Sequence, residues 1–294
     1  MVIERALEKL KREGRTKGAG SSSGISRAHH EVGVARHRPQ PVQAPSQPRP
    51  VIPRLEIDKV AAEAAHVLPF IGDGDDDTSR PHAAYRMLRT RLLHSMRNHS
   101  WTTIALTSPG PAEGKSITAL NLAFNMARER SREVVLIDLD MRNPSLCRYL
   151  GITPPVEIIE YLAGRVQPSE ALFSLSDNLL VAGGVMATEV ASELLTTDRL
   201  EVLLDYIKSI CSNPVILLDL PPVLMTDEAL LLAPRVDATL LVVGEGRTRR
   251  DSLLRAKQLL SEFTMAGVIL NRSVESFGTD GYYKYGYGEG NSRY

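Results

Sequence analysis

Residues 103–116 read TIALTSPGPAEGKS, and this stretch decides the fold. An apolar run suited to a buried strand, 103–107, leads into a Gly/Pro-rich loop, and the ITALNLA that follows has helical spacing. A strand, a loop and a helix in this order are the context of a phosphate-binding loop. In such a loop Gly114 permits close backbone approach, Lys115 contacts the β- and γ-phosphates, and Ser116 ligates magnesium.

The loop departs from the consensus at its start. The expected first glycine falls at Pro109, and Gly110 is displaced by one position. A Gly/Pro turn that happens to precede a helix is the alternative, but it leaves Lys115 and Ser116 unexplained. We therefore expect nucleotide contacts along the whole loop. The residues concerned are Gly110, Pro111, Ala112, Glu113, Gly114, Lys115, Ser116 and Ile117.

Short apolar runs alternate with helical patterns along the rest of the chain. After 103–107, runs rich in Val, Ile and Leu occur at 134–138, 179–182, 215–219, 239–243 and 268–270. Nearly continuous apolar runs are typical of strands that are buried on both faces. The pattern predicts an α/β fold: a mostly parallel, P-loop NTPase-like sheet flanked by helices, with ligands at the carboxyl ends of the strands.

Composition divides the chain into three parts. Residues 1–79 are expected to form a short helix at 2–12 and a disordered tether rich in Pro, Gly and Ser. Residues 80–274 are expected to form the P-loop domain, which begins with a basic helix at 80–97. Residues 275–294 are rich in Gly and Tyr and predict a flexible tail.

Charge and cysteine content limit the partners and the compartment. The 35 basic and 35 acidic side chains cancel, so we expect no nucleic-acid partner. Two cysteines without metal-ligand spacing indicate neither a disulfide framework nor a zinc site. We found no apolar stretch of bilayer-spanning length and no signal peptide, and we therefore expect a cytoplasmic protein.

Tyrosines are concentrated at the end of the chain. Five of the nine tyrosines lie in the last 13 residues, which even placement does not explain. The alternative is a Gly/Tyr low-complexity end without a specific task. We predict that these tyrosines are phosphoacceptors. They are Tyr282, Tyr283, Tyr285, Tyr287 and Tyr294.

Aspartates follow two of the predicted strands. Asp138 and Asp140 stand in VVLIDLDMR, and Asp219 stands in VILLDLPP. Magnesium prefers hard oxygen ligands, so these carboxylates beside Ser116 and the phosphates of ATP suffice for a site, although any one of them alone could be a strand-end cap. We predict that Asp138, Asp140 and Lys115 are catalytic. Asp138 is our choice for the general base that takes the proton from a tyrosine.

Three ordered motifs resemble those of the bacterial tyrosine kinases, the BY-kinase family that regulates capsule and exopolysaccharide synthesis. They are SPGPAEGKS at 108–116, IDLDMRNP at 137–144 and LDLPP at 218–222. The resemblance implies an ATP- and Mg²⁺-dependent protein tyrosine autokinase, with Lys115, Ser116 and the three aspartates as its ATP and magnesium residues and Asn271 beside the adenine. Ala112 replaces a usual glycine of the family, and Ala83 replaces the glutamate that begins its assembly helix.

The resemblance also implies partners. In the family, a neighbouring subunit of a homo-oligomer phosphorylates the tyrosine cluster in trans. Further expected partners are a membrane-spanning polysaccharide chain-length regulator, which would recruit the chain to the inner face of the membrane, and a cognate tyrosine phosphatase.

Two other functions compete with the kinase. The first is a partition or septum-positioning ATPase of the deviant P-loop class, but that class carries an extra lysine early in the loop that this chain lacks. The second is a nucleotide-binding regulator without catalysis, which phosphate transfer would exclude. GTPase and eukaryotic-type kinase signatures do not occur in the sequence.

Overall fold

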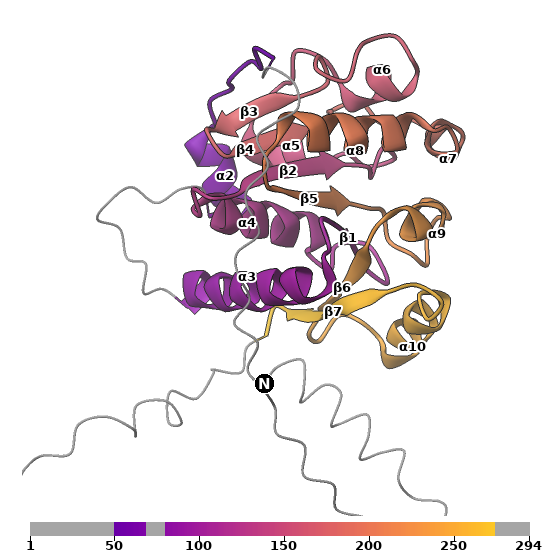
Figure 1. Ribbon diagram of the computed structural model, residues 1–294. Helices are drawn as coiled ribbons and strands as arrows, with labels where there is room; N and C mark the ends of the chain where they lie inside the picture. Colours follow the sequence, from indigo (N-terminus) through magenta and orange to yellow (C-terminus); the bar gives the residue numbers. More distant parts are fainter. Residues whose placement is uncertain (1–49, 69–79, 274–294) are drawn as a thin grey trace, which may run out of the picture.

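The computed structural model describes residues 50–68 and 80–273, with only the backbone of Arg80. A seven-stranded sheet runs through the domain in the order β3-β4-β2-β5-β1-β6-β7 (Figure 1). All neighbouring pairs are parallel except β3 and β4, which confirms the predicted α/β class. The strands are β1 (Thr103–Thr107), β2 (Glu133–Asp138), β3 (Phe173–Ser176), β4 (Leu179–Ala182), β5 (Pro214–Asp219), β6 (Ala238–Gly244) and β7 (Met265–Asn271).

Helices cover both faces of the sheet. They are α2 (Lys59–Ala64), α3 (Arg80–His99), α4 (Lys115–Ala127), α5 (Leu146–Leu150), α6 (Ile158–Leu162), α7 (Ala191–Leu195), α8 (Arg199–Ile210), α9 (Glu228–Leu232) with a 3₁₀ turn η1 (Ala233–Arg235), and α10 (Arg250–Leu259). The helices α2 to α5 share one apolar core with the sheet, and α6 to α10 share the other. Both faces are therefore dry, as a parallel sheet requires.

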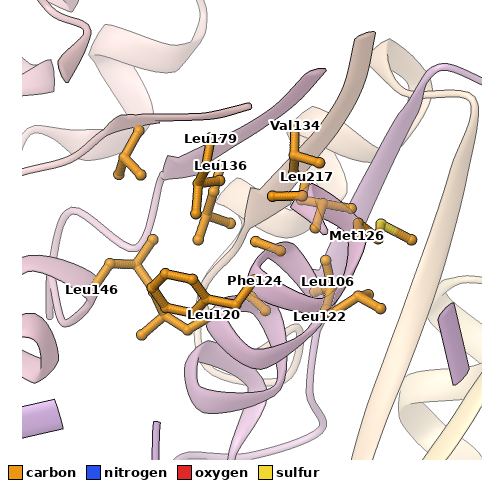
Figure 2. Close-up of a cluster of buried hydrophobic side chains, with 14 of the residues drawn as sticks. Leu106, Leu120, Leu122, Phe124, Met126, Val134, Leu136, Leu146, Leu179 and Leu217 are labelled. Carbon is orange, nitrogen blue, oxygen red and sulfur yellow. The ribbon is translucent and has the colours of Figure 1, made fainter. Parts of the chain in front are cut away.

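Successive residues of the central strands alternate between the two cores. Leu136 and Leu217 face α4, where Leu120 and Phe124 pack against them (Figure 2). Ile137, the next residue along β2, belongs to the opposite core. This alternation explains the continuous apolar runs of the sequence, because every position of a doubly covered strand is buried.

The edge strand β3 was not predicted. Its residues FSLS alternate between buried and half-buried, and the strand has only four residues. It pairs antiparallel with β4 through a tight connection at Asp177 and Asn178. Polar serines at every second position interrupt FSLS, so it lacks the continuous apolar run by which the other strands were recognised.

Residues 50–68, which the sequence analysis assigned to the tether, pack against the domain. Leu55 donates its backbone N–H to Ser174 of β3 at 2.9 Å, and Ser174 returns a bond to Pro53. Further along, the Asn121 side chain of α4 accepts from Leu68 N and donates to His66 O, at 2.6 and 3.1 Å. Residues 50–68 are therefore part of the packed domain, whereas residues 1–49, including the predicted helix 2–12, and residues 69–79 lie outside the described part.

The predicted basic helix is α3, which begins at Arg80 and extends two residues beyond the expected end. Arg89 donates to the carbonyl of Asn125 near the end of α4, at 3.0 Å. This contact ties α3 to the helix that starts at the phosphate loop. Within residues 50–68 and 80–273, no helix has both the length and the apolar character needed to cross a bilayer.

Candidate nucleotide and magnesium site

The phosphate loop joins β1 to α4 at the carboxyl edge of the sheet. Gly114 adopts φ +88° and caps α4, which begins at Lys115. An added Cβ at Gly114 would lie 2.1 Å from Nδ2 of Asn271, so only glycine fits there. The preceding Ala112 also has a positive φ, +57°. The strand, loop and helix predicted from residues 103–116 are all present.

The loop residues differ in what their side chains do. The Ser108 hydroxyl donates to the carbonyl of Gly110 at 2.7 Å and closes the start of the loop. Pro111 and Ala112 are exposed, whereas Ile117 in the first turn of α4 packs on the core. The loop therefore offers its backbone and Lys115 to a ligand, while Ile117 anchors the helix.

Lys115 lies among carboxylates. Its Nζ is 2.9 Å from Oδ2 of Asp140 and 3.2 Å from Oδ1 of Asp219, and it donates to the Ser116 hydroxyl at 3.0 Å. The Lys115 side chain is 8% exposed and that of Asp219 is fully buried. Burial lowers the pKa of Lys115, but the carboxylates outweigh burial and hold the pKa above its ordinary value. Lys115 is therefore charged.

Asp138 is buried beside the other carboxylates. Its Oδ2 accepts the backbone N–H groups of Ser145 and Leu146 at 2.9 and 3.0 Å, at the start of α5. Burial and the negative charge of Asp219 raise the pKa of Asp138 to about 7, although Lys115 and these amides oppose the shift. Burial also raises the pKa of Asp219, against the pull of Lys115. A cation bound beside these two carboxyls would stabilise their ionised forms and offset the cost of burying them.

The residues predicted to hold magnesium thus meet at one place. Asp138 and Asp219 are Cα partners at the ends of β2 and β5, and Lys115 connects Asp219 with Asp140 and Ser116. Hydroxyl and carboxylate oxygens are donors that fit Mg²⁺. Among residues 50–68 and 80–273, no group of three or more His, Cys, Asp or Glu side chains is arranged to hold a metal ion. The magnesium site stays a prediction.

On the opposite side of the loop, the strand ends carry no charged side chain. Asn271, at the end of β7, donates to the backbone carbonyl of Glu113 at 3.0 Å. The side chain of Glu113 is buried and accepts from Gly244 N at 2.7 Å and from the Thr248 hydroxyl. Gly244 and Thr248 were missed by the sequence analysis, because 131 and 135 positions separate them from Glu113. Asn271 lies beside the loop, and its predicted contact with adenine stays a prediction.

Arg142 was also missed, although it stands two residues after Asp140. Its Nε donates to Oε1 of the fully buried Glu228 at 2.7 Å, and its Nη1 donates to the exposed Glu189 at 3.0 Å. An open hollow of about 570 Å³ lies beside it. The hollow is lined by Arg142, Val223, Leu224, Met225, Thr226, Asp227, Leu230 and Leu259. The tyrosine cluster lies outside the described residues.

The fold and the site define a P-loop nucleotide-binding protein. No family model matches the chain. The chain is 32% identical over 216 residues to the putative tyrosine-protein kinase EpsB of Ralstonia solanacearum, covering 72% of this chain and 28% of EpsB. It is 26% identical over 205 residues to the tyrosine-protein kinase YwqD of Bacillus subtilis, covering 68% of this chain and 84% of YwqD.

A solved structure has the same fold. The kinase domain of the Escherichia coli tyrosine kinase ETK superposes with a TM-score of 0.63 at 24% identity, covering 81% of this chain and 92% of that domain. In sequence the chain is thus similar to bacterial tyrosine-protein kinases. It spans about a quarter of the length of EpsB, so the resemblance there concerns one part of a longer protein.

Proposed function

We propose that this protein is an ATP- and Mg²⁺-dependent protein tyrosine kinase whose acceptors are the tyrosines of its own C-terminal tail. One observation carries the proposal: Nζ of Lys115 lies within 3.2 Å of carboxylate oxygens of Asp140 and Asp219, directly beside Ser116. This arrangement joins a phosphate-binding cation to a set of hard oxygen ligands. The tyrosine cluster of the sequence provides acceptors for the transfer.

In the proposed reaction, a tyrosine oxygen attacks the γ-phosphorus of ATP in line with the bond to the β-phosphate. The new O–P bond forms, the bridging bond breaks and ADP leaves. Lys115 stabilises the charge on the β- and γ-phosphates, and Asp138 takes the phenolic proton. Ser116, Asp138, Asp140 and Asp219 are the residues that would hold Mg²⁺, which would supply positive charge beside the phosphates.

The finer parts of the proposal rest on the family resemblance. They are transfer in trans within a homo-oligomer and regulation of exopolysaccharide or capsule synthesis. The partners are a membrane-spanning chain-length regulator and a cognate phosphatase, at the cytoplasmic face of the membrane. Each added phosphate brings about −1.5 to −2 charges at neutral pH, so a multiply phosphorylated tail would be repelled from an acidic site. Phosphorylation would thereby loosen the oligomer.

The test is phosphotyrosine detection with mass-spectrometric mapping. Wild type is compared with Lys115→Met, with a chain truncated after Gly281, and with Lys208→Met as a control on the exposed face of α8. We expect label in the last 13 residues of wild type and of the control, and none in Lys115→Met. Mixing the truncated chain as donor with Lys115→Met as acceptor tests transfer in trans. ATP hydrolysis without phosphotyrosine would instead indicate a partition or septum-positioning ATPase of the deviant P-loop class.

A further inference from the structure

Glu113 places a negative charge inside a loop that is expected to bind phosphates. A carboxylate facing the phosphates would repel them. Glu113 is 5% exposed, and its Oε2 accepts the backbone N–H of Gly244 at 2.7 Å and the hydroxyl of Thr248. The carboxylate is therefore directed towards the end of β6. Both of its partners are donors, and neither adds a charge.

The partners of Glu113 are held by their own turn. Gly244 O accepts the backbone N–H groups of Arg247 and Thr248 at 3.1 and 2.9 Å, which folds the chain back on itself after β6. The Gly244 N–H is shared between Glu113 and the Thr248 hydroxyl, which it reaches at 2.9 Å. The hydroxyl thus accepts one hydrogen bond and donates its proton to the carboxylate.

Close contacts fix this arrangement sterically. An added Cβ at Gly244 would lie 2.8 Å from Oε2 of Glu113, so the carboxylate approaches the β6 backbone as closely as glycine permits. The Asn271 side chain donates a hydrogen bond to the backbone carbonyl of Glu113 at 3.0 Å. One loop residue therefore connects the phosphate loop with the ends of both β6 and β7.

We infer that Glu113 and Thr248 are positioning residues of the nucleotide site. The hydrogen bonds from Thr248 and Gly244 hold the loop in the shape that presents its backbone and Lys115 to the phosphates, and they keep the charge of Glu113 away from them. This role depends on the proposed function only in that ATP is the ligand. It requires no transfer to tyrosine.

Thr248→Val tests this role, because valine keeps the side-chain shape and removes the hydroxyl. The full chain is titrated with a fluorescent ATP analogue in the presence of Mg²⁺. We expect Kd to rise about tenfold, as for the loss of a hydrogen bond to a charged group. Thr248→Ser keeps the hydroxyl and should restore Kd to within about twofold. Thr197→Val is the control, because its hydroxyl bonds only to Leu194 O at the end of α7.

Glu113→Ala, alone and with Thr248→Val, completes a double-mutant cycle. If Thr248 acts through Glu113, Thr248→Val should cost nothing further once Glu113 is alanine. An unchanged Kd in Thr248→Val, or the same loss in both backgrounds, would overturn the assignment. So would a fall in the Tm of the nucleotide-free variant, relative to Thr197→Val, with Kd unchanged.

Turnover gives a second readout that separates positioning from catalysis. KM for ATP should rise in Thr248→Val by the same factor as Kd, with kcat within about twofold of wild type, because uniform binding is lost. A fall in kcat with KM unchanged would contradict the role. If wild type makes no phosphotyrosine while Thr248→Val still weakens binding, the kinase proposal fails and the positioning role stands.

Discussion

Two pairs of strands end at the same edge of one sheet with opposite chemistry. β2 and β5 end opposite each other in Asp138 and Asp219, and β6 and β7 end opposite each other in Gly244 and Asn271. The first pair buries like charges that Lys115 must balance, whereas the second pair makes only hydrogen bonds to the phosphate loop. In both pairs the last residues are Cα partners, so the two halves of the edge differ in the side chains presented there: the strand ends are charged in one half and uncharged in the other. We call these the charged half and the neutral half.

The largest expected effect comes from removing the cation on the charged side. Lys115→Met should lower the free energy of unfolding at pH 7 by about 3 kcal/mol, because Asp140 and Asp219 stay buried without their partner. Urea denaturation measures this change. Lys208→Met, on an exposed and weakly paired lysine, should change stability by less than about 0.5 kcal/mol. If the two variants were equally stable, Lys115 would not be needed to balance the buried charges of Asp140 and Asp219.

On the neutral side, Gly114→Ala should cost about 2 kcal/mol of folding free energy, because it combines positive φ with a Cβ placed 2.1 Å from Asn271. Gly246→Ala is the matched control: φ is +69° there, but nothing lies within 4 Å of the added Cβ. It should cost about 1 kcal/mol. Denaturation of both variants separates the steric part from the backbone part. If Gly114→Ala lost less stability than Gly246→Ala, then Asn271 would not restrict the side chain at position 114.

The pH dependence of stability tests the buried carboxyls. The Asp138 proton leaves the unfolded chain near pH 4 but leaves the folded chain near pH 7, so the folded state binds more protons between these values. Stability should therefore fall as pH rises through this window. Asp138→Asn removes the titrating carboxyl. As the pH rises from 5 to 8, the unfolding free energy of this variant should increase by about 2 kcal/mol relative to that of wild type.

These curves are measured by urea denaturation in EDTA without nucleotide. Asp177→Asn is the control, because the Asp177 side chain is 91% exposed in the turn between β3 and β4. A curve for Asp138→Asn that ran parallel to that of wild type would contradict the raised pKa of Asp138.

The smallest expected effect concerns Ala112 in the phosphate loop. Its φ of +57° strains an alanine, so Ala112→Gly should relieve that strain. Glycine has more conformational entropy than alanine in the unfolded chain, which opposes this gain. The net gain in stability should be about 0.5 kcal/mol. Differential scanning calorimetry measures it. A loss of stability would mean that Ala112 is not strained in the folded loop.

Much of the charged half could be predicted from sequence, because each of its residues follows a recognisable strand or belongs to the GKS segment. All six predicted strands are present. Burial on both faces explains the continuous apolar runs of β1, β2, β5 and β6, whereas the edge strand β7 is half-buried throughout. The neutral half could not be predicted beyond Asn271. Glu113 meets Gly244 and Thr248 only through the tertiary fold, and no local pattern marks such a contact.

The missed strand β3 did leave a signal. FSLS and LLVA flank an Asp and an Asn, which is the pattern of a short hairpin. Residues 50–68 gave weaker indications. Their contacts with Ser174 and Asn121 use backbone groups, and backbone hydrogen bonds leave almost no trace in side-chain composition.

The described chain enters and leaves the domain at opposite edges of the sheet. It enters beside β3, where Leu55 bonds to Ser174, and it leaves after β7 (Figure 1). A force applied between these two points would act across the strands, along the direction of their hydrogen bonds. Such a pull would first detach residues 50–68 from β3 and detach β7 from β6. The next strand along the chain from residues 50–68 is β1, which lies between β5 and β6, so tension would reach the centre of the sheet before it reached β3 and β4.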